Sequence, residues 1–300
     1  MGRVCRGVTV RGSGRLGDPG IVCRGRSLGL ALLTAFCCVL PAGGAAAAQT
    51  EPEETWAAAA VLEAPEGRIE QVYANMPEIT LYGAGFDREA LEAGEGYLAQ
   101  EKLTQTGVVS FAESGEGIGY YVLLDVSGSM PGAYFRGVKE GIADLQEQLR
   151  AQDKLVLCTF GEEVVLAADG SQTREQMDQI LEGLQNRDQR TLLFEAIDRV
   201  AALAEQERDC PRKILAVISD GEDIAVGKKL AQEAQNTLRE KGLPVYALCI
   251  RDTATANINT FGEFARTSGG RLVTFRPEEG QELLTQLAEE LGKDLVVRYE

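Results

Sequence analysis

Near-continuous hydrophobic runs alternate with amphipathic stretches from residue 120 onward. Residues 120–125 (YYVLLD) and 213–220 (KILAVISD) are almost entirely apolar until each ends in an aspartate. Runs of this kind are typical of strands that are buried on both faces. Their alternation with helical stretches predicts an α/β fold with a mostly parallel sheet that is covered by helices on both sides.

Further strands and helices in this part of the chain are predicted from the same alternation of apolar runs and amphipathic stretches. Two short apolar runs, KLVLCTFG and EEVVLAA, are joined closely enough to form a hairpin. Two further strands are predicted at PVYALCI and RLVTF. The 3.6-residue periodicity predicts helices near residues 132–150, 173–184, 191–207, 226–241, 258–267 and 279–291. In the last helix, one apolar stripe is expected to face the core: Leu283, Leu284, Leu287 and Leu291.

The pattern differs on both sides of this alternating region. Residues 68–119 show short alternating runs with turn residues between them, which predict a small β-rich flanking segment. Residues 49–67 are acidic and alanine-rich, so we expect a linker. Residues 295–300 look like a terminal strand. Because strand-like segments flank one insertion, we expect Leu295–Tyr299 to pair with strands of residues 68–118.

The first 48 residues have the pattern of a secretory signal peptide. Six arginines precede the apolar stretch 28–40, and small residues follow it up to residue 48. Thirteen apolar residues are fewer than the roughly 20 that a membrane-spanning helix needs. We expect cleavage near Ala48 and a secreted or cell-surface protein. An uncleaved anchor, or a longer anchored protein, would instead place the chain at a membrane.

Charge narrows the classes of partner. The chain has a formal net charge of −16, and without residues 1–48 it has 24 basic against 45 acidic residues, a net charge of −21. Such a surface repels nucleic acid phosphates and anionic lipid headgroups, so no nucleic acid partner is expected. A basic protein that displays one exposed carboxylate would suit the negative electrostatic field of this surface.

Histidine and cysteine usage limits the chemistry. The chain contains no histidine, which excludes Ser-His and Cys-His nucleophile pairs and histidine-ligated zinc. Three cysteines remain after residue 48, and an odd, sparse set is not a disulfide framework. We expect Cys158 and Cys249 to be small buried residues in strands, and Cys210 to be an exposed thiol in a loop.

Oxygen-bearing side chains gather where the two most apolar strands end. Asp125, Ser127 and Ser129 share one short loop, and Asp220 follows the second strand. Ligands of open parallel sheets bind at the carboxyl ends of the strands, near the point where the strand order reverses. If the strands are neighbours, two carboxylates come together and need a cation between them. An all-oxygen set favours Mg²⁺, Mn²⁺ or Ca²⁺.

The motifs YVLLDVSGSM, TLLFEAI and ISDGED resemble the von Willebrand factor type A domain. The resemblance spans about residues 120–291 and implies a doubly wound, six-stranded, Rossmann-like sheet over residues 120–294. It also implies a metal-ion-dependent adhesion site made by an Asp-x-Ser-x-Ser loop, a threonine and a second aspartate. In this chain these residues are Asp125, Ser127, Ser129, Thr191 and Asp220.

The resemblance further implies how such a site works. The serines and the threonine contact Mg²⁺, or Mn²⁺ or Ca²⁺ in its place, and the aspartates act largely through water. Neutral hydroxyl ligands leave the ion electron-poor, so that an Asp or Glu carboxylate of a protein partner completes its coordination. The expected function is therefore adhesion-type protein binding without enzymatic activity. A dehalogenase-type enzyme would need a second aspartate at position 127, which is serine.

Each of these positions also has a purely structural interpretation. Asp125 and Asp220 could cap turns or helix starts, and Thr191 could cap the helix that follows it. Ser127 and Ser129 could be ordinary turn serines. Glu222 and Asp223 are interpreted as a solvated turn. Gly128 and Gly221 are expected to adopt backbone angles that other residues avoid.

Two other functions fit the same fold. The domain could be a scaffold for an ATPase, a chelatase-type machine or a membrane complex, usually in the cytoplasm. Alternatively, a bound metal could only stabilise the fold and contact no outside ligand.

Overall fold

A computed structural model describes the chain in seven stretches. These are residues 8–11, 56–58, 62–64, 67–75, 77–98, 101–223 and 228–300. The predicted signal peptide and its cleavage site lie outside the described residues, except for β1 (Val8–Arg11), which pairs with β6 (Glu95–Leu98).

The larger half of the molecule is built on a six-stranded sheet with the order β11-β10-β9-β12-β13-β14. All neighbouring pairs are parallel except β10 and β11, which form the predicted antiparallel hairpin. The expected α/β fold with a mostly parallel six-stranded sheet is therefore confirmed. The strands are β9 (Ile118–Asp125), β10 (Lys154–Phe160), β11 (Val164–Ala168), β12 (Arg212–Ser219), β13 (Val245–Ile250) and β14 (Arg271–Phe275).

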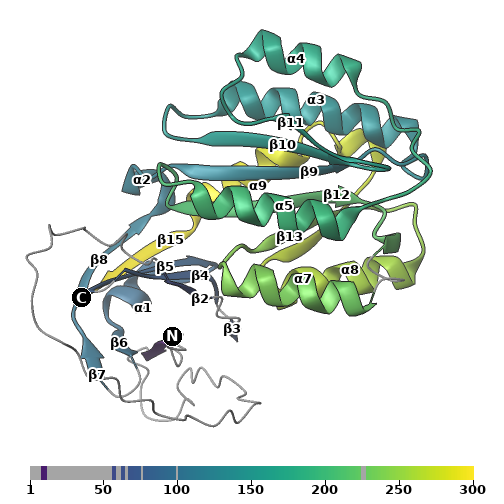
Figure 1. Ribbon diagram of the computed structural model, residues 1–300. Helices are drawn as coiled ribbons and strands as arrows, with labels where there is room; N and C mark the ends of the chain where they lie inside the picture. Colours follow the sequence, from purple (N-terminus) through teal and green to yellow (C-terminus); the bar gives the residue numbers. More distant parts are fainter. Residues whose placement is uncertain are drawn as a thin grey trace, which may run out of the picture.

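Helices cover both faces of this sheet (Figure 1). One core lies between the sheet and α3, α4 and α9, and a second core lies between the opposite face and α5, α7 and α8. The predicted leucine stripe of the last helix is buried in the first core. The bounds are α3 (Gly132–Gln148), α4 (Arg174–Gly183), α5 (Leu193–Gln206), α7 (Lys228–Glu240), α8 (Thr255–Thr267) and α9 (Leu283–Lys293), with a 3-10 turn, η1, at Pro277–Glu279.

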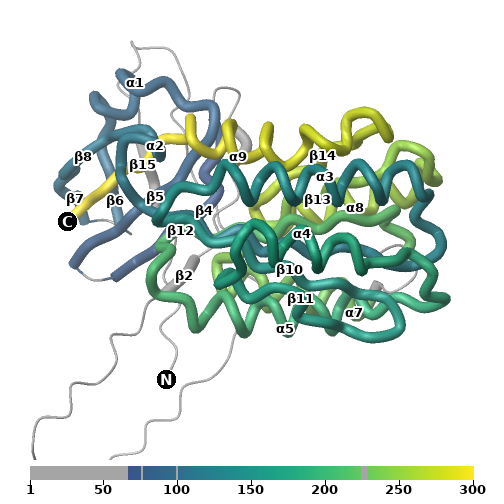
Figure 2. The backbone as a smooth tube through the Cα atoms, turned by 90° about the horizontal axis from the view of Figure 1, so that it is seen from above, coloured from purple at the N-terminus to yellow at the C-terminus, as the bar shows by residue number. Residues whose placement is uncertain are grey.

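A second, antiparallel sheet lies beside the first, as Figure 2 shows from above. We call it the flanking sheet, and its order is β2-β4-β5-β15-β8, with β3 paired to β4. A small third sheet has the order β1-β6-β7. The remaining elements are β2 (Trp56–Ala58), β3 (Leu62–Ala64), β4 (Gly67–Asn75), β5 (Glu78–Ala84), α1 (Arg88–Glu92), β7 (Glu101–Leu103), β8 (Gln105–Ser110), α2 (Phe111–Ser114) and β15 (Leu295–Tyr299).

Strand β15 confirms the predicted pairing across the insertion. It lies between β5 and β8 and is antiparallel to both. Three of its side chains, Leu295, Val297 and Tyr299, join the core of the flanking sheet. The last strand therefore occupies an interior position of a sheet whose other strands all come from residues 56–110.

The expected linker at residues 49–67 is partly wrong. Within it, β2 and β3 both pair with β4 along the same edge. The physical reason is that β4 would otherwise present a long row of unpaired backbone groups, which strand pairing satisfies. The acidic, alanine-rich composition of the segment concealed this pairing.

Cys210 also differs from its prediction. It is 1 % exposed, and its thiol lies 3.5 Å from the carbonyl oxygen of Gln152. Cys158 and Cys249 are buried as expected, and all three are free thiols. Burial raises the pKa of the Cys210 thiol to about 11, so it is not a reactive thiolate at neutral pH. No helix in the described part of the chain is long and apolar enough to span a membrane.

A buried cluster of charges joins the two large sheets. Arg212, the first residue of β12, is fully buried and donates to Glu70 of β4, to Asp294 before β15, and to the carbonyl oxygen of Leu291 at the end of α9. Tyr246 of β13 also donates to Glu70. One guanidinium therefore contacts both sheets and the last helix.

The two buried carboxylates of this cluster, Glu70 and Asp294, differ in the direction of their pKa shifts. Burial alone would raise the pKa of Glu70, but the charges of Arg212 and Arg68 hold it below its ordinary value. Burial raises the pKa of Asp294 to about 6 in spite of Arg212. The guanidinium also lies 5.0 Å from the ring centroid of Phe111 and 5.3 Å from that of Tyr82.

We expect Arg212→Met to lower the free energy of unfolding by about 3–5 kcal/mol, because two buried carboxylates lose their counter-charge. Urea titration at neutral pH measures this change. Arg88→Met is the control, because the ion pairs of Arg88 are exposed to solvent and its loss should be much smaller than that of Arg212. Equal losses for the two variants would show that the buried cluster does not stabilise the contact between the sheets.

Candidate metal centre

The candidate site lies at the carboxyl ends of β9 and β12. The chain leaves β9 toward β10 on one side and returns to form β12 on the other, so the strand order reverses here. Parallel sheets leave a crevice at this point, because successive connections diverge to opposite faces. Asp125 is the last residue of β9, and Asp220 directly follows β12.

The loop after β9 folds around the side chain of Asp125, which is 1 % exposed. One carboxylate oxygen accepts a hydrogen bond from the backbone N–H of Ser127 at 2.8 Å. The other accepts from the hydroxyl of Ser219, the last residue of β12, at 2.8 Å. The turn-capping interpretation of Asp125 therefore accounts for one of its two oxygens, and the second is fixed by the neighbouring strand.

Ser127 and Ser129 direct their hydroxyls toward each other. The two Oγ atoms lie 2.9 Å apart, and the side chain of Ser127 is almost fully buried. This separation fits a hydrogen bond. It is also close to the spacing of about 3.0 Å between adjacent corners of an octahedron with metal–oxygen distances near 2.1 Å. Two neutral oxygens are thus already positioned as a pair.

Asp220 and Gly221 form the facing loop. Asp220 is 7 % exposed, and one of its oxygens accepts from the backbone N–H of Glu222 at 3.0 Å. Gly221 has φ of +79°, a conformation that favours glycine, as expected from its position in the turn. Gly128 has no such angle, so the backbone freedom predicted for it is not used.

Thr191 does not cap the following helix. The residue before α5 is Leu192, which makes no side-chain cap, and the Thr191 hydroxyl donates instead to the carboxylate of Asp223. Asp223 is half-buried, so its interpretation as part of a solvated turn is wrong, whereas Glu222 is exposed as expected. Local sequence could not reveal this contact, because 32 residues separate its partners.

The carboxylates of the site interact electrostatically. Burial raises the pKa of Asp125 to about 6, and the charge of Asp220 adds to this shift. The pKa of Asp223 is also raised, first by burial and then by the charges of Asp220 and Glu222. Asp220 therefore lies within range of the charges of both Asp125 and Asp223.

Among the residues that the structure describes, neither Asp125 nor Asp220 forms an ion pair with a lysine or arginine. A buried carboxylate without a counter-charge is costly, so a bound cation fits this site. No cluster of three or more acidic or cysteine side chains within the described ranges is arranged to hold a metal. The structure brings together the hydroxyls of Ser127 and Ser129 beside the Asp125 loop, whereas the Thr191 hydroxyl is bonded to Asp223. Carboxylate and hydroxyl oxygens of this kind are hard donors that suit Mg²⁺.

Sequence reasoning missed three residues around the site. Ser219 fixes Asp125, Asp223 holds Thr191, and Asp188 supports the serine loop through its backbone. The carbonyl oxygen of Asp188 accepts from the N–H of Gly128 at 2.8 Å. Only the position of Ser219, directly before Asp220 at the end of a predicted neighbouring strand, was a usable signal in the sequence.

Comparison with known proteins supports this description of the fold. Residues 120–222 match the family model of the von Willebrand factor type A domain. This segment carries the pattern of that domain. We use the name vWA-like region for residues 120–294, the predicted bounds of the domain, of which the match covers residues 120–222. A search among curated proteins found no match.

Solved structures are similar to this chain at low sequence identity, and one of them has a TM-score above 0.5. A von Willebrand factor type A protein from Catenulispora acidiphila is 12 % identical, with a TM-score of 0.51, and the match covers 81 % of this chain and 51 % of that one. BatB from Bacteroides thetaiotaomicron is 19 % identical, with a TM-score of 0.47, over 59 % of this chain and all of that one. Proximal thread matrix protein 1 from the mussel byssus, solved with a zinc-occupied adhesion motif, is 16 % identical, with a TM-score of 0.46, over 58 % of this chain and 48 % of that one.

We expect Mg²⁺ to raise the melting temperature of the protein more at pH 7 than at pH 5. Since the pKa of Asp125 in the folded, cation-free protein is raised to about 6, its ionisation destabilises the fold as the pH rises through 6. A cation relieves this cost but must displace the proton at pH 5, so its affinity there should be about tenfold lower.

Thermal unfolding with and without MgCl₂ at both pH values measures the effect. NaCl of matched ionic strength is the control for screening. An equal gain at pH 5 and pH 7 would contradict a role for the Asp125 carboxylate in cation binding.

Proposed function

We propose that the vWA-like region binds a protein partner through a divalent cation, with Mg²⁺ as the first candidate. Asp125, Ser127, Ser129, Thr191 and Asp220 would hold the ion. A carboxylate from an Asp or Glu of the partner would complete its coordination. The observation that carries this proposal is the pair of buried aspartates without a basic partner in the described chain, beside two hydroxyls 2.9 Å apart.

The bound cation supplies a Lewis-acidic centre that attracts an external carboxylate. The chain's own residues prepare this centre before the partner arrives. Ser219 and the N–H of Ser127 fix the Asp125 carboxylate, so that little ordering remains when the ion binds. The Ser127 and Ser129 hydroxyls are neutral, so they leave more of the ion's charge for the partner than carboxylates in the same positions would.

No enzymatic step is proposed for this site. Without histidine, the chain offers no imidazole base. The buried thiols are protonated near neutral pH because burial raises the pKa of Cys158 to about 11 and that of Cys249 to about 12. The arrangement supports recognition by coordination, in which no covalent bond forms or breaks.

We expect calorimetric titration with MgCl₂ to give saturable uptake by the wild-type protein. Ser127→Ala/Ser129→Ala should lower the affinity about 100-fold or more, since two direct ligands are lost. Ser171→Ala, which removes a hydroxyl from an exposed turn near Asp169, should bind as the wild type does. Titrations with MnCl₂ and CaCl₂ show which ion the site prefers.

Asp125→Ala provides a second test, in which urea unfolding confirms that the variant is folded. The absence of heat with all three salts in a folded wild-type protein would refute the proposal. Partner capture that persists in EDTA and in Ser127→Ala/Ser129→Ala would favour a metal that only stabilises the fold.

The proposed location is outside the cytoplasm, at the cell surface or secreted. The basic and apolar pattern of residues 1–48 supports this, and those residues lie almost entirely outside the described part of the chain. The competing proposal is a scaffold that assembles with an ATPase or membrane complex.

Cell fractionation separates these two locations. We expect the mature chain in the extracytoplasmic fraction, with its first residue near Gln49 by N-terminal sequencing. Recovery of the mature chain only from the cytosol would favour the scaffold.

A further inference from the structure

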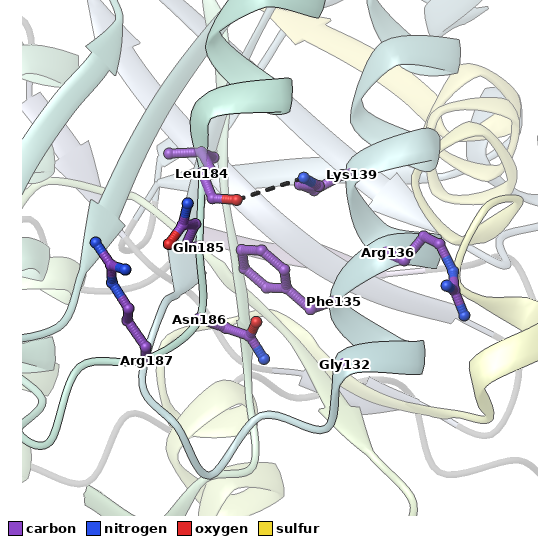
Figure 3. A pocket seen from close by; sticks show the side chains of 8 residues that line it. All are labelled: Gly132, Phe135, Arg136, Lys139, Leu184, Gln185, Asn186 and Arg187. Carbon is purple, nitrogen blue, oxygen red and sulfur yellow. Dashed lines mark hydrogen bonds between the residues drawn. The ribbon is translucent and has the colours of Figure 1, made fainter.

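A hollow of about 440 Å³ opens between the start of α3 and the segment 184–187 that follows α4. Figure 3 shows Phe135 near its centre, with Arg136 and Arg187 on opposite sides and Lys139 above. Every charged residue that lines the hollow is basic. This is unusual on a chain whose formal net charge is −16.

The cations of the hollow are not neutralised. Within the described residues, Arg136 and Arg187 take part in no ion pair, and both side chains are exposed. Lys139 donates only a long hydrogen bond, 3.4 Å, to the carbonyl oxygen of Leu184, and its ammonium lies 5.5 Å from the ring centroid of Phe135. Three positive charges thus face solvent around one concave surface.

The spacing of these charges favours a peptide over a small anion. A phosphate or a single carboxylate is bound by donors that converge on one point, whereas Arg136 and Arg187 stand apart across the Phe135 ring (Figure 3). An extended segment with acidic side chains at several positions can reach both sides. The helix α3 also begins here without a side-chain cap, which adds positive potential at the hollow.

The hollow shares a wall with the candidate metal centre. Asn186 donates to the carbonyl oxygen of Met130 at 2.5 Å, and the Asp188 carbonyl accepts from Gly128. Gly132 at the rim lies three positions after Ser129 in the chain, a span of at most about 11 Å. A partner segment with one carboxylate at the metal would therefore extend over the hollow within a few residues.

We propose that this hollow is a docking subsite for an acidic peptide segment of the protein partner. Arg136, Lys139 and Arg187 contact its carboxylates, and Phe135 and Asn186 form the floor. This inference deepens the proposed function and rests on it, because it places one carboxylate of the partner at the metal and the neighbouring acidic residues over the hollow. The overall negative charge does not prevent it, because at physiological salt repulsion is screened beyond about 8 Å, so the local charges dominate.

The test measures binding of a fluorescein-labelled octa-aspartate peptide by anisotropy in MgCl₂. Arg136→Gln/Arg187→Gln should weaken binding about tenfold, as expected for the loss of two exposed ion pairs. Arg208→Gln/Lys229→Gln is the matched control. It removes the same charge from exposed positions on other helices or loops, where Lys229 has only a 3.8 Å contact with Glu233. The control should change the affinity less than about twofold.

Two results would overturn the proposal. One is an equal loss of affinity in both double variants, which would show that only net charge matters. The other is inorganic phosphate that binds the wild type as tightly as the peptide and loses affinity equally in Arg136→Gln/Arg187→Gln, which would identify a small-anion site.

Repeating the titrations in EDTA and with Ser127→Ala/Ser129→Ala distinguishes failure of the metal proposal from failure of the docking proposal. If the hollow binds peptide independently, Arg136→Gln/Arg187→Gln still weakens the residual binding under both conditions. Magnesium uptake by Arg136→Gln/Arg187→Gln, measured by calorimetry, should equal that of the wild type.

Discussion

The buried guanidinium of Arg212 is the contact on which the arrangement of the two sheets depends. It lies at the start of β12, in the middle of the mostly parallel six-stranded sheet, which we call the central sheet. It binds carboxylates from the flanking sheet and from the connection to β15. Its bond to Leu291 adds the end of the last helix. Because a buried charge that loses its partners is costly, displacement of one half of the molecule against the other is opposed by this cluster.

The two buried acidic clusters of the protein contrast in a way that bears on function. At the amino end of β12, Glu70 and Asp294 have Arg212 between them. At its carboxyl end, Asp125 and Asp220 have hydroxyls and backbone N–H groups but no basic side chain among the described residues. At the amino end of β12, the protein therefore supplies the counter-charge for its buried carboxylates itself. At the other end no basic side chain in the described chain supplies a counter-charge, and this is the observation behind the proposed cation.

Much of the fold was predictable because its signals are local. Strands β9 and β12 are buried on both faces, so their apolar runs identified them directly. Asp125 at the end of β9 and Asp220 directly after β12 marked the candidate site. The pairing of β15 followed from strand-like flanks on both sides of one insertion. The strands themselves were recognised from hydrophobic periodicity, which can be read within a single segment of the sequence.

What was missed depends on contacts between distant segments. Cys210 is covered because its loop packs near Gln152, and Asp223 is drawn inward by Thr191. The basic hollow likewise combines a helix start with a loop some fifty residues later. Composition alone suggested a uniformly acidic surface, because a net charge does not show where the charges gather.

The interior position of β15 has a consequence for synthesis on the ribosome. Strands β5 and β8 emerge early, yet the strand that joins them follows only after the entire vWA-like region. Until then, both present unpaired edges that can bind other nascent chains. The order of translation therefore favours completion of the central sheet first, with the flanking sheet closing last around a strand delivered from far along the chain.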